Sequence, residues 1–84
     1  MIVKIFVRDN CPKCPKAKDV GKALEGKNTA DVRYFNVSDA DGLAESVFYD
    51  VLSTPSIVVV DKNDKEVVGF RADVPALEEL EKYL

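Results

Sequence analysis

The 84-residue chain has no histidine, no tryptophan and only two cysteines, and none of its apolar runs approaches the roughly 18 residues needed to span a bilayer. It also lacks the Gly-rich turn of a dinucleotide-binding fold, for which it is too short. No basic excess is present: the net charge is −3, so we expect neither a nucleic-acid partner nor a membrane partner. Met1–Arg8 is too short and too soon interrupted by charge to be a signal peptide, and we therefore expect the cytoplasm.

What is present suits one small globular domain over residues 1–84. Apolar residues make up 46% of the chain and charged residues 32%, a balance typical of folded chains. A domain of this size buries only about 60–65% of the surface of its unfolded chain, so its core is small. Five lysines lie close together in the first half: Lys13, Lys16, Lys18, Lys22 and Lys27. Such a run is ordinarily a solvated helix face, but its place just after the two cysteines leaves a docking role open.

Hydrophobic periodicity and turn residues predict seven elements in the order β-α-β-α-β-β-α. The predicted strands are Ile2–Val7, Val32–Val37, Ile57–Val60 and Glu66–Phe70. The first predicted helix covers residues 13–25, and the last covers Ala76–Leu84 after Pro75. A short second helix is predicted after Ser38 and Asp39, which are typical N-cap residues, because Leu43, Val47 and Val51 follow at helical spacing. The first three strands can run parallel through helical crossovers, and the fourth adds as a hairpin edge. This is an α/β fold, a four-stranded mixed sheet with helices on both faces that buries all four apolar strands.

The segment Cys11-Pro12-Lys13-Cys14 holds both cysteines, and three roles compete for them. A structural staple is the weakest, because so short a loop removes little entropy from the unfolded chain and the cytoplasm disfavours permanent disulfides. Zinc or an iron–sulfur cluster would find only two ligands here and would need a second subunit or an external thiol. Thiol–disulfide exchange is the third role, since two thiols three residues apart at a helix start suit it.

The reactive species in such exchange is the thiolate, which a helix N-terminus stabilises. If the helix begins near Pro12 or Lys13, Cys11 lies at its cap as the exposed nucleophile. Cys14 then lies partly covered in the first turn and resolves the mixed disulfide. The charge of Lys13 favours the thiolate as well. Pro15 cannot donate to the Cys11 carbonyl, so either the first turn is distorted or the regular helix begins nearer Pro15.

Thr54-Pro55 precedes the third predicted strand, at a position where proline is tolerated, and taken alone this peptide bond is expected to be trans. Together with Cys11-Pro12-Lys13-Cys14, Gly69 in the fourth strand and the order of elements, it resembles the thioredoxin-like superfamily over the whole chain. The resemblance implies a thioredoxin-like fold, a cis bond before Pro55 packed beside the cysteines, and a dithiol oxidoreductase that needs no cofactor.

Within that superfamily the chain combines two resemblances. Its compact start and Pro12 are similar to glutaredoxins, whereas Pro55–Val60 followed by Glu66–Gly69 looks more like thioredoxin. Asn10 stands where thioredoxins have a tryptophan, and the first strand has no acidic residue resembling their buried carboxylate. Gly69-Phe70-Arg71 replaces the Gly-Gly doublet of glutaredoxins, which removes part of the usual glutathione cradle.

We therefore expect a monomeric oxidoreductase that reduces protein disulfides through a reversible Cys11–Cys14 disulfide. Its expected electron donor is a flavoprotein resembling thioredoxin reductase, rather than glutathione, because Lys13 and Lys16 could meet an acidic partner. The alternatives are a glutathione-dependent glutaredoxin and a redoxin that holds an iron–sulfur cluster or zinc between two subunits. A metal chaperone is disfavoured because such domains end in a strand, and a non-catalytic module is disfavoured because both cysteines are kept.

Overall fold

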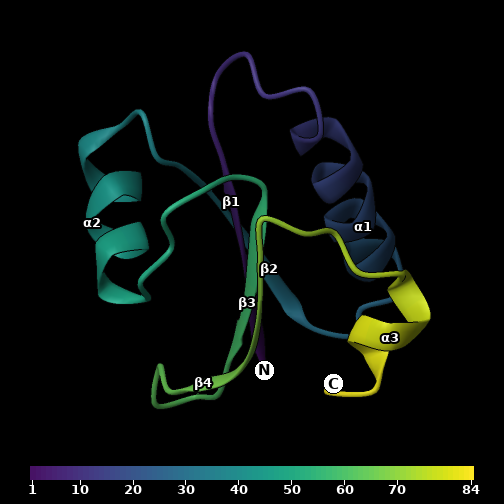
Figure 1. Cartoon of the computed structure of the whole chain (residues 1–84). Helices are drawn as coiled ribbons and strands as arrows, with labels where there is room; N and C mark the ends of the chain where they lie inside the picture. Colours follow the sequence, from purple (N-terminus) through teal and green to yellow (C-terminus); the bar gives the residue numbers. More distant parts are fainter.

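The computed structural model describes all of residues 1–84, and its elements follow the predicted order (Figure 1). The strands are β1 (Ile2–Val7), β2 (Asp31–Asn36), β3 (Ser56–Val60) and β4 (Glu66–Arg71), and the helices are α1 (Cys14–Gly26), α2 (Ala40–Phe48) and α3 (Leu77–Glu81). Strand β1 coincides with its prediction, but α3 has only five residues and stops before the predicted end at Leu84. None of the three helices has the length and apolar character that crossing a membrane requires.

The strands lie in the order β2-β1-β3-β4. β2 runs parallel to β1, and β3 and β4 form the predicted antiparallel hairpin. The prediction that the first three strands run parallel is wrong for β3, which pairs antiparallel with β1 and places Ser56 opposite Phe6. The cause is the connection after α2, because residues 49–55 run back along the sheet to the end where β1 finishes (Figure 1). Such a connection spans at most about 25 Å when extended, which exceeds the roughly 14 Å length of α2.

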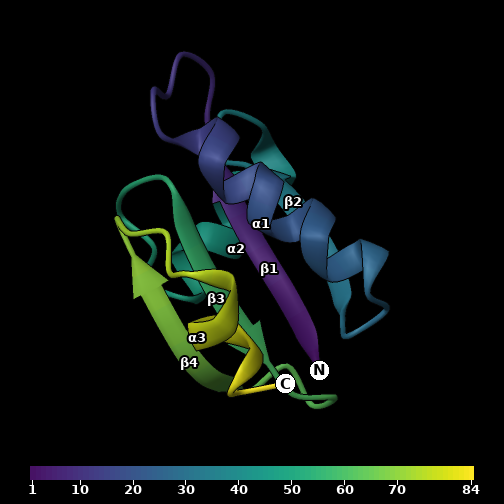
Figure 2. The ribbon, with the colours of Figure 1, turned by 90° about the vertical axis from the view of Figure 1, so that its right-hand side faces the viewer.

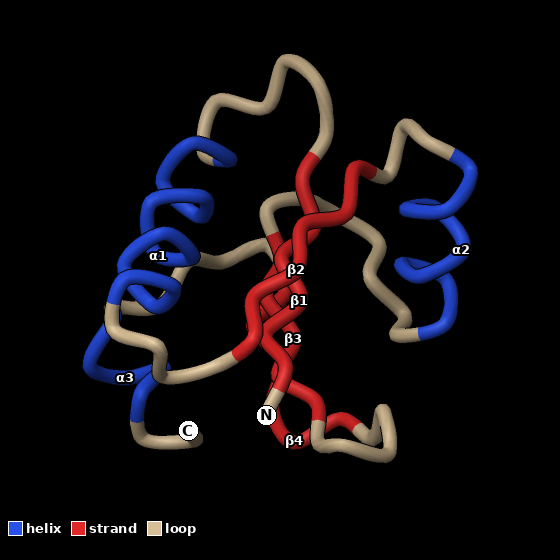
Figure 3. The backbone as a smooth tube through the Cα atoms, turned by 180° about the vertical axis from the view of Figure 1, so that it is seen from behind, coloured by secondary structure: helices blue, strands red, loops and turns tan.

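The sheet separates two layers of helix, with α1 and α3 on one face and α2 on the other (Figures 1 and 2), an arrangement that Figure 3 shows from behind. Successive strand residues point to opposite faces, so β1 and β3 contribute to two cores. The core beneath α1 and α3 comprises Val3, Ile5, Val7, Cys14, Ala17, Leu24, Ile57, Val59 and Leu80. The core beneath α2 comprises Phe6, Tyr49, Val51, Val58 and Val60.

The sequence predicted that all four strands are buried, but the two outer strands are partly exposed. β2 and β4 each have a neighbour on one side only. Asp31, Arg33 and Tyr34 of β2 are exposed, and so are Glu66 and Val67 of β4. Only the central pair is buried along its length, β3 completely and β1 from Val3 to Val7, because a domain this small has too little helix to cover the sheet edges.

Helix α2 packs on the sheet through its small residues. Its buried residues are Gly42 and Ser46, whereas Leu43 and Val47 are 53% and 68% exposed. A Cβ atom at Gly42 would overlap the backbone of Asn36 at the end of β2, so glycine is what allows this close approach. The apolar periodicity thus predicted the helix correctly but did not mark the face that the helix buries.

A buried lysine links α2 to the centre of the sheet. The Lys4 ammonium on β1 donates to Glu45 Oε1 over 2.7 Å and to the Tyr49 hydroxyl over 3.1 Å, and it lies over the Tyr49 ring. Burial disfavours the charged form of Lys4, but the hydrogen bonds to Glu45 and Tyr49 outweigh it and raise the pKa of Lys4. The charge is therefore accommodated in an apolar strand, where it helps to hold α2 in place.

Candidate active site

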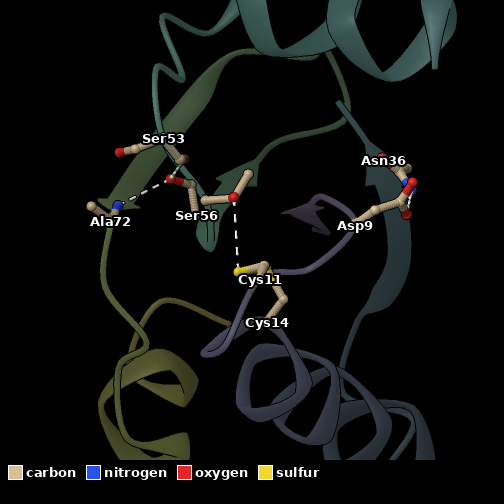
Figure 4. The surroundings of a disulfide bond; sticks show 8 residues. Asp9, Cys11, Cys14, Asn36, Ser53, Ser56 and Ala72 are labelled. Carbon is tan, nitrogen blue, oxygen red and sulfur yellow. Dashed lines mark hydrogen bonds between the residues drawn. A yellow bond between two sulfur atoms is a disulfide. The ribbon is translucent and has the colours of Figure 1, made fainter. Parts of the chain in front are cut away.

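The two cysteines form a disulfide beside the end of the sheet where β1 finishes (Figure 4), with their Cα atoms 5.3 Å apart. Cys14 is the first residue of α1 and is only 3% exposed, because its side chain belongs to the core beneath that helix. Cys11 lies in the preceding loop and is partly exposed. The pair is thus asymmetric: Cys11 is partly exposed, whereas Cys14 is almost completely buried.

Helix α1 begins one residue later than predicted. Lys13 is its N-cap, so the expectation that Cys11 occupies the cap is wrong, and Cys11 lies two residues before it. Pro15 takes the second helical position, where its missing N–H leaves no intrahelical hydrogen bond unmade. The two alternatives for this turn are thereby resolved in favour of a helix that starts next to Pro15. The Cys14 N–H donates to the Cys11 carbonyl over 3.4 Å and closes the turn between the cysteines.

Thr54 and Pro55 come from the second half of the chain and lie close to the cysteines. The Thr54 hydroxyl donates to Cys11 Sγ over 3.9 Å, drawn as the dashed line at Cys11 in Figure 4. Pro55 is buried just before β3, and the Thr54–Pro55 peptide bond is cis. A hydroxyl at this place can donate to a Cys11 thiolate when the disulfide is reduced, and such a charge-assisted bond is stronger than one to neutral sulfur.

Ser56 is a site residue that the sequence reasoning missed. It is fully buried, its hydroxyl donates to the Ser53 carbonyl over 2.7 Å, and it accepts from the Ala72 N–H over 3.1 Å (Figure 4). This hydroxyl ties the loop that carries Thr54 to the segment after β4. The available signal was a lone serine at the head of a strand whose other residues are all apolar, since a buried hydroxyl needs partners.

The loop that presents Cys11 is shaped by side-chain contacts and an unusual backbone angle. Asn10 has a φ of 59°, a conformation that asparagine adopts more readily than most residues. The neighbouring Asp9 Oδ1 accepts from Asn36 Nδ2 over 3.1 Å (Figure 4). Asn10 therefore has a conformational role at the position where the sequence analysis noted only a missing tryptophan.

Basic side chains predominate around the disulfide. Two hollows flank it: one is lined by Arg8, Asp9, Asn10, Cys11, Pro12, Cys14, Pro15 and Lys18, and the other by Lys13, Lys16, Pro55, Ala72, Asp73 and Val74. Together these hollows contain four basic and two acidic residues, although the chain as a whole is acidic. No group of three or more His, Cys, Asp or Glu side chains is placed to hold a metal ion.

The sequence matches a family model described as a thioredoxin domain over residues 1–84. The chain belongs to the thioredoxin-domain family. Among curated proteins, no sequence matches it. Several solved structures share the fold. Thioredoxin 1 of Thermosipho africanus is 17% identical, with a TM-score of 0.80 over 99% of this chain and 89% of that one.

Two further structures are similar to this thioredoxin-domain protein. A mutant thioredoxin of Halobacterium salinarum is 20% identical, with a TM-score of 0.81 over 96% of this chain and 68% of that one. A thioredoxin-fold protein of Helicobacter pylori is 23% identical, with a TM-score of 0.71 over 98% of this chain and 70% of that one. The family and the joined cysteine pair support a thiol–disulfide oxidoreductase in general terms.

Proposed function

We propose that this thioredoxin-domain protein reduces the disulfides of other proteins by exchange at Cys11 and Cys14. The observation that carries the proposal is the asymmetry of the pair, because Cys11 is partly exposed while Cys14 is buried. In the reduced protein the Cys11 thiolate attacks one sulfur of the target disulfide, forms a mixed disulfide, and releases the other target sulfur as a thiolate. Thr54 supports this role, since its hydroxyl lies next to Cys11 Sγ.

The second step returns the protein to the disulfide state. The Cys14 thiolate attacks Cys11 Sγ, the Cys11–Cys14 bond forms, and the second target sulfur leaves as a thiolate. Two electrons pass from the protein dithiol to the target, and the target is left with two thiols once its thiolates take up protons. Burial keeps Cys14 from competing for external disulfides, while its position 5.3 Å from Cys11 between Cα atoms leaves it within reach of the mixed disulfide.

The two cysteine variants test this division of roles. Cys11→Ser is expected to abolish reduction of a model protein disulfide, because no accessible thiol remains. Cys14→Ser is expected to accumulate a covalent complex with the target, visible by mass spectrometry and lost on adding dithiothreitol. Accumulation in Cys11→Ser instead, or faster alkylation of Cys14 than of Cys11 in the reduced protein, would reverse the assignment.

We further propose that a flavoprotein of the thioredoxin-reductase kind supplies the electrons. Lys13 and Lys16 support this, since they lie beside Pro55 in one of the hollows next to the disulfide and could attract an acidic reductase. Gly69-Phe70-Arg71 stands where glutaredoxins have a Gly-Gly doublet, so part of the usual glutathione cradle is missing. The test measures NADPH oxidation with one disulfide substrate, first with a thioredoxin reductase and then with glutathione and glutathione reductase. Turnover with glutathione and glutathione reductase, and none with thioredoxin reductases, would place the chain among glutaredoxins by function.

A further inference from the structure

The exposed apolar side chains of this molecule are concentrated near α2. Of the eight large apolar residues that are exposed, four lie on α2 or in the loop that follows it: Leu43, Val47, Phe48 and Leu52. Leu52 is 95% exposed, and α2 has no second helix beside it on its face of the sheet (Figure 1). A gathering of exposed apolar groups on a small protein usually marks an interaction surface.

Part of this surface is hollowed beside the cysteine loop. A pocket of about 120 Å³, here called the Leu52 pocket, is lined by the apolar residues Val37, Leu43, Val51 and Leu52 and by the polar residues Arg8, Ser46, Ser53 and Thr54. Cavities of about 150 Å³ hold a benzene molecule, so the pocket has room for one aliphatic side chain. Thr54 joins it to the redox pair, because the same residue donates to Cys11 Sγ over 3.9 Å.

The surroundings of the disulfide differ in character between the two faces of the sheet. The Leu52 pocket adjoins α2, whereas Lys13 and Lys16 lie at the start of α1 (Figure 1), where they line the hollow that contains Pro55. A segment bound across Cys11 would therefore meet a pocket with four apolar residues in its lining on one side, and two lysines with one aspartate on the other. Neighbouring residues of an extended segment are about 3.3–3.6 Å apart, so a residue adjacent to the target cysteine can reach the pocket.

We propose that the Leu52 pocket selects substrate proteins whose disulfide cysteine is flanked by a large aliphatic residue on one side and by acidic residues on the other. The aliphatic side chain enters the pocket, and the acidic residues face Lys13 and Lys16. This inference rests on the proposed attack by Cys11, which transfers two electrons to the bound disulfide as described above. Beyond that function, the inference specifies which kind of substrate segment the protein binds.

The test uses the reduced full chain and synthetic peptides whose single cysteine carries thionitrobenzoate as a mixed disulfide. Four peptides combine Leu or Ser on one side of the cysteine with Glu or Lys on the other, and a second set exchanges the two sides. The release of coloured thionitrobenzoate measures the second-order rate. We expect at least a fivefold preference for Leu over Ser, the effect of burying about half of a leucine side chain. Glu should be favoured about threefold over Lys, and less so at high salt.

Two variants decide whether the Leu52 pocket causes the apolar preference. Leu52→Ser should reduce the Leu-to-Ser ratio to within about twofold, and circular dichroism and thermal unfolding should show an intact fold, because this side chain is nearly fully exposed. Val47→Ser is the matched control, since Val47 is 68% exposed on α2 but does not line the pocket. Val47→Ser should keep the ratio of the unaltered protein.

Several outcomes would overturn the inference. These are equal rates for Leu and Ser peptides, no preference for Glu over Lys at low salt, or equal loss of the Leu preference in both variants. A dimer of the unaltered chain that Leu52→Ser converts to a monomer in analytical ultracentrifugation would assign the pocket to a second copy instead. Failure of the proposed function is distinguishable, because the reduced chain would then release thionitrobenzoate from every peptide no faster than an equal concentration of a simple thiol.

Discussion

Gly42→Ala tests how closely α2 approaches the sheet and hence how the wall of the Leu52 pocket is held. Gly42 is the third residue of α2, and a Cβ atom built there overlaps the carbonyl oxygen and carbon of Asn36. These are backbone atoms at the end of β2, so no side-chain rotation can relieve the overlap. Gly26 provides a matched control, because it is the last residue of α1 and a Cβ atom there meets nothing within 4 Å.

The expected magnitudes follow from two opposing effects. In a helix without steric conflict, alanine is favoured over glycine by up to about 1 kcal/mol, and neither glycine has a positive φ that alanine would resist. Overpacking against atoms that cannot move aside costs about 1–3 kcal/mol. We therefore expect Gly26→Ala to raise the free energy of unfolding by about 0.5–1 kcal/mol. Gly42→Ala should lower it by about 1–2 kcal/mol, which corresponds to a fall in Tm of about 4–16 °C.

Urea and thermal unfolding, followed by circular dichroism on the disulfide form of both variants, measure these changes. The disulfide is kept intact so that its loss does not contribute. If Gly42→Ala proves as stable as the unaltered chain, or gains as much as Gly26→Ala, the close packing of α2 on Asn36 is refuted. In that case the inward face of α2 must also be reassigned.

Three further predictions concern charge. Lys13→Glu should make the protein more reducing in a redox titration at low salt, because it removes a cation that favours the thiolate form. Lys62→Glu, in the turn after β3, should leave the potential nearly unchanged. Glu45→Ala should lower the free energy of unfolding in urea by about 2 kcal/mol because it deprives the buried Lys4 of its carboxylate, and Lys4→Met should cost less. Tyr34 is 39% exposed, and the partial burial of its side chain, with a hydrogen bond to Glu25 of α1, raises the pKa of Tyr34 to about 12. The protonated Tyr34 hydroxyl contributes fully to the free energy of unfolding below about pH 10, and this contribution is lost as the pH rises toward 12. Tyr34→Phe should therefore flatten the pH dependence of urea unfolding between these two values.

The order of elements and the identity of the cysteine pair could be predicted from the sequence because both depend on local signals. Apolar runs and turn residues marked the strands, including β1 at its observed ends, and the spacing of Cys11 and Cys14 indicated exchange chemistry. The thioredoxin-like fold came from the combination of that motif with Thr54-Pro55 and the element order. A further local rule also applied, since a proline near a helix start must occupy the first turn, as Pro15 does.

What the tertiary structure decided depends on contacts between distant segments. The direction of β3 follows from the return path of residues 49–55, which no periodicity records. Leu43 and Val47 face solvent because the approach of Gly42 to Asn36 and the Lys4–Glu45 pair set the rotation of α2, so the helix buries two small residues rather than its most apolar ones. The placement of Thr54 against Cys11, and of Ser56 beneath it, likewise required the whole sheet, since 43 residues separate Thr54 from Cys11 and only strand pairing brings them together.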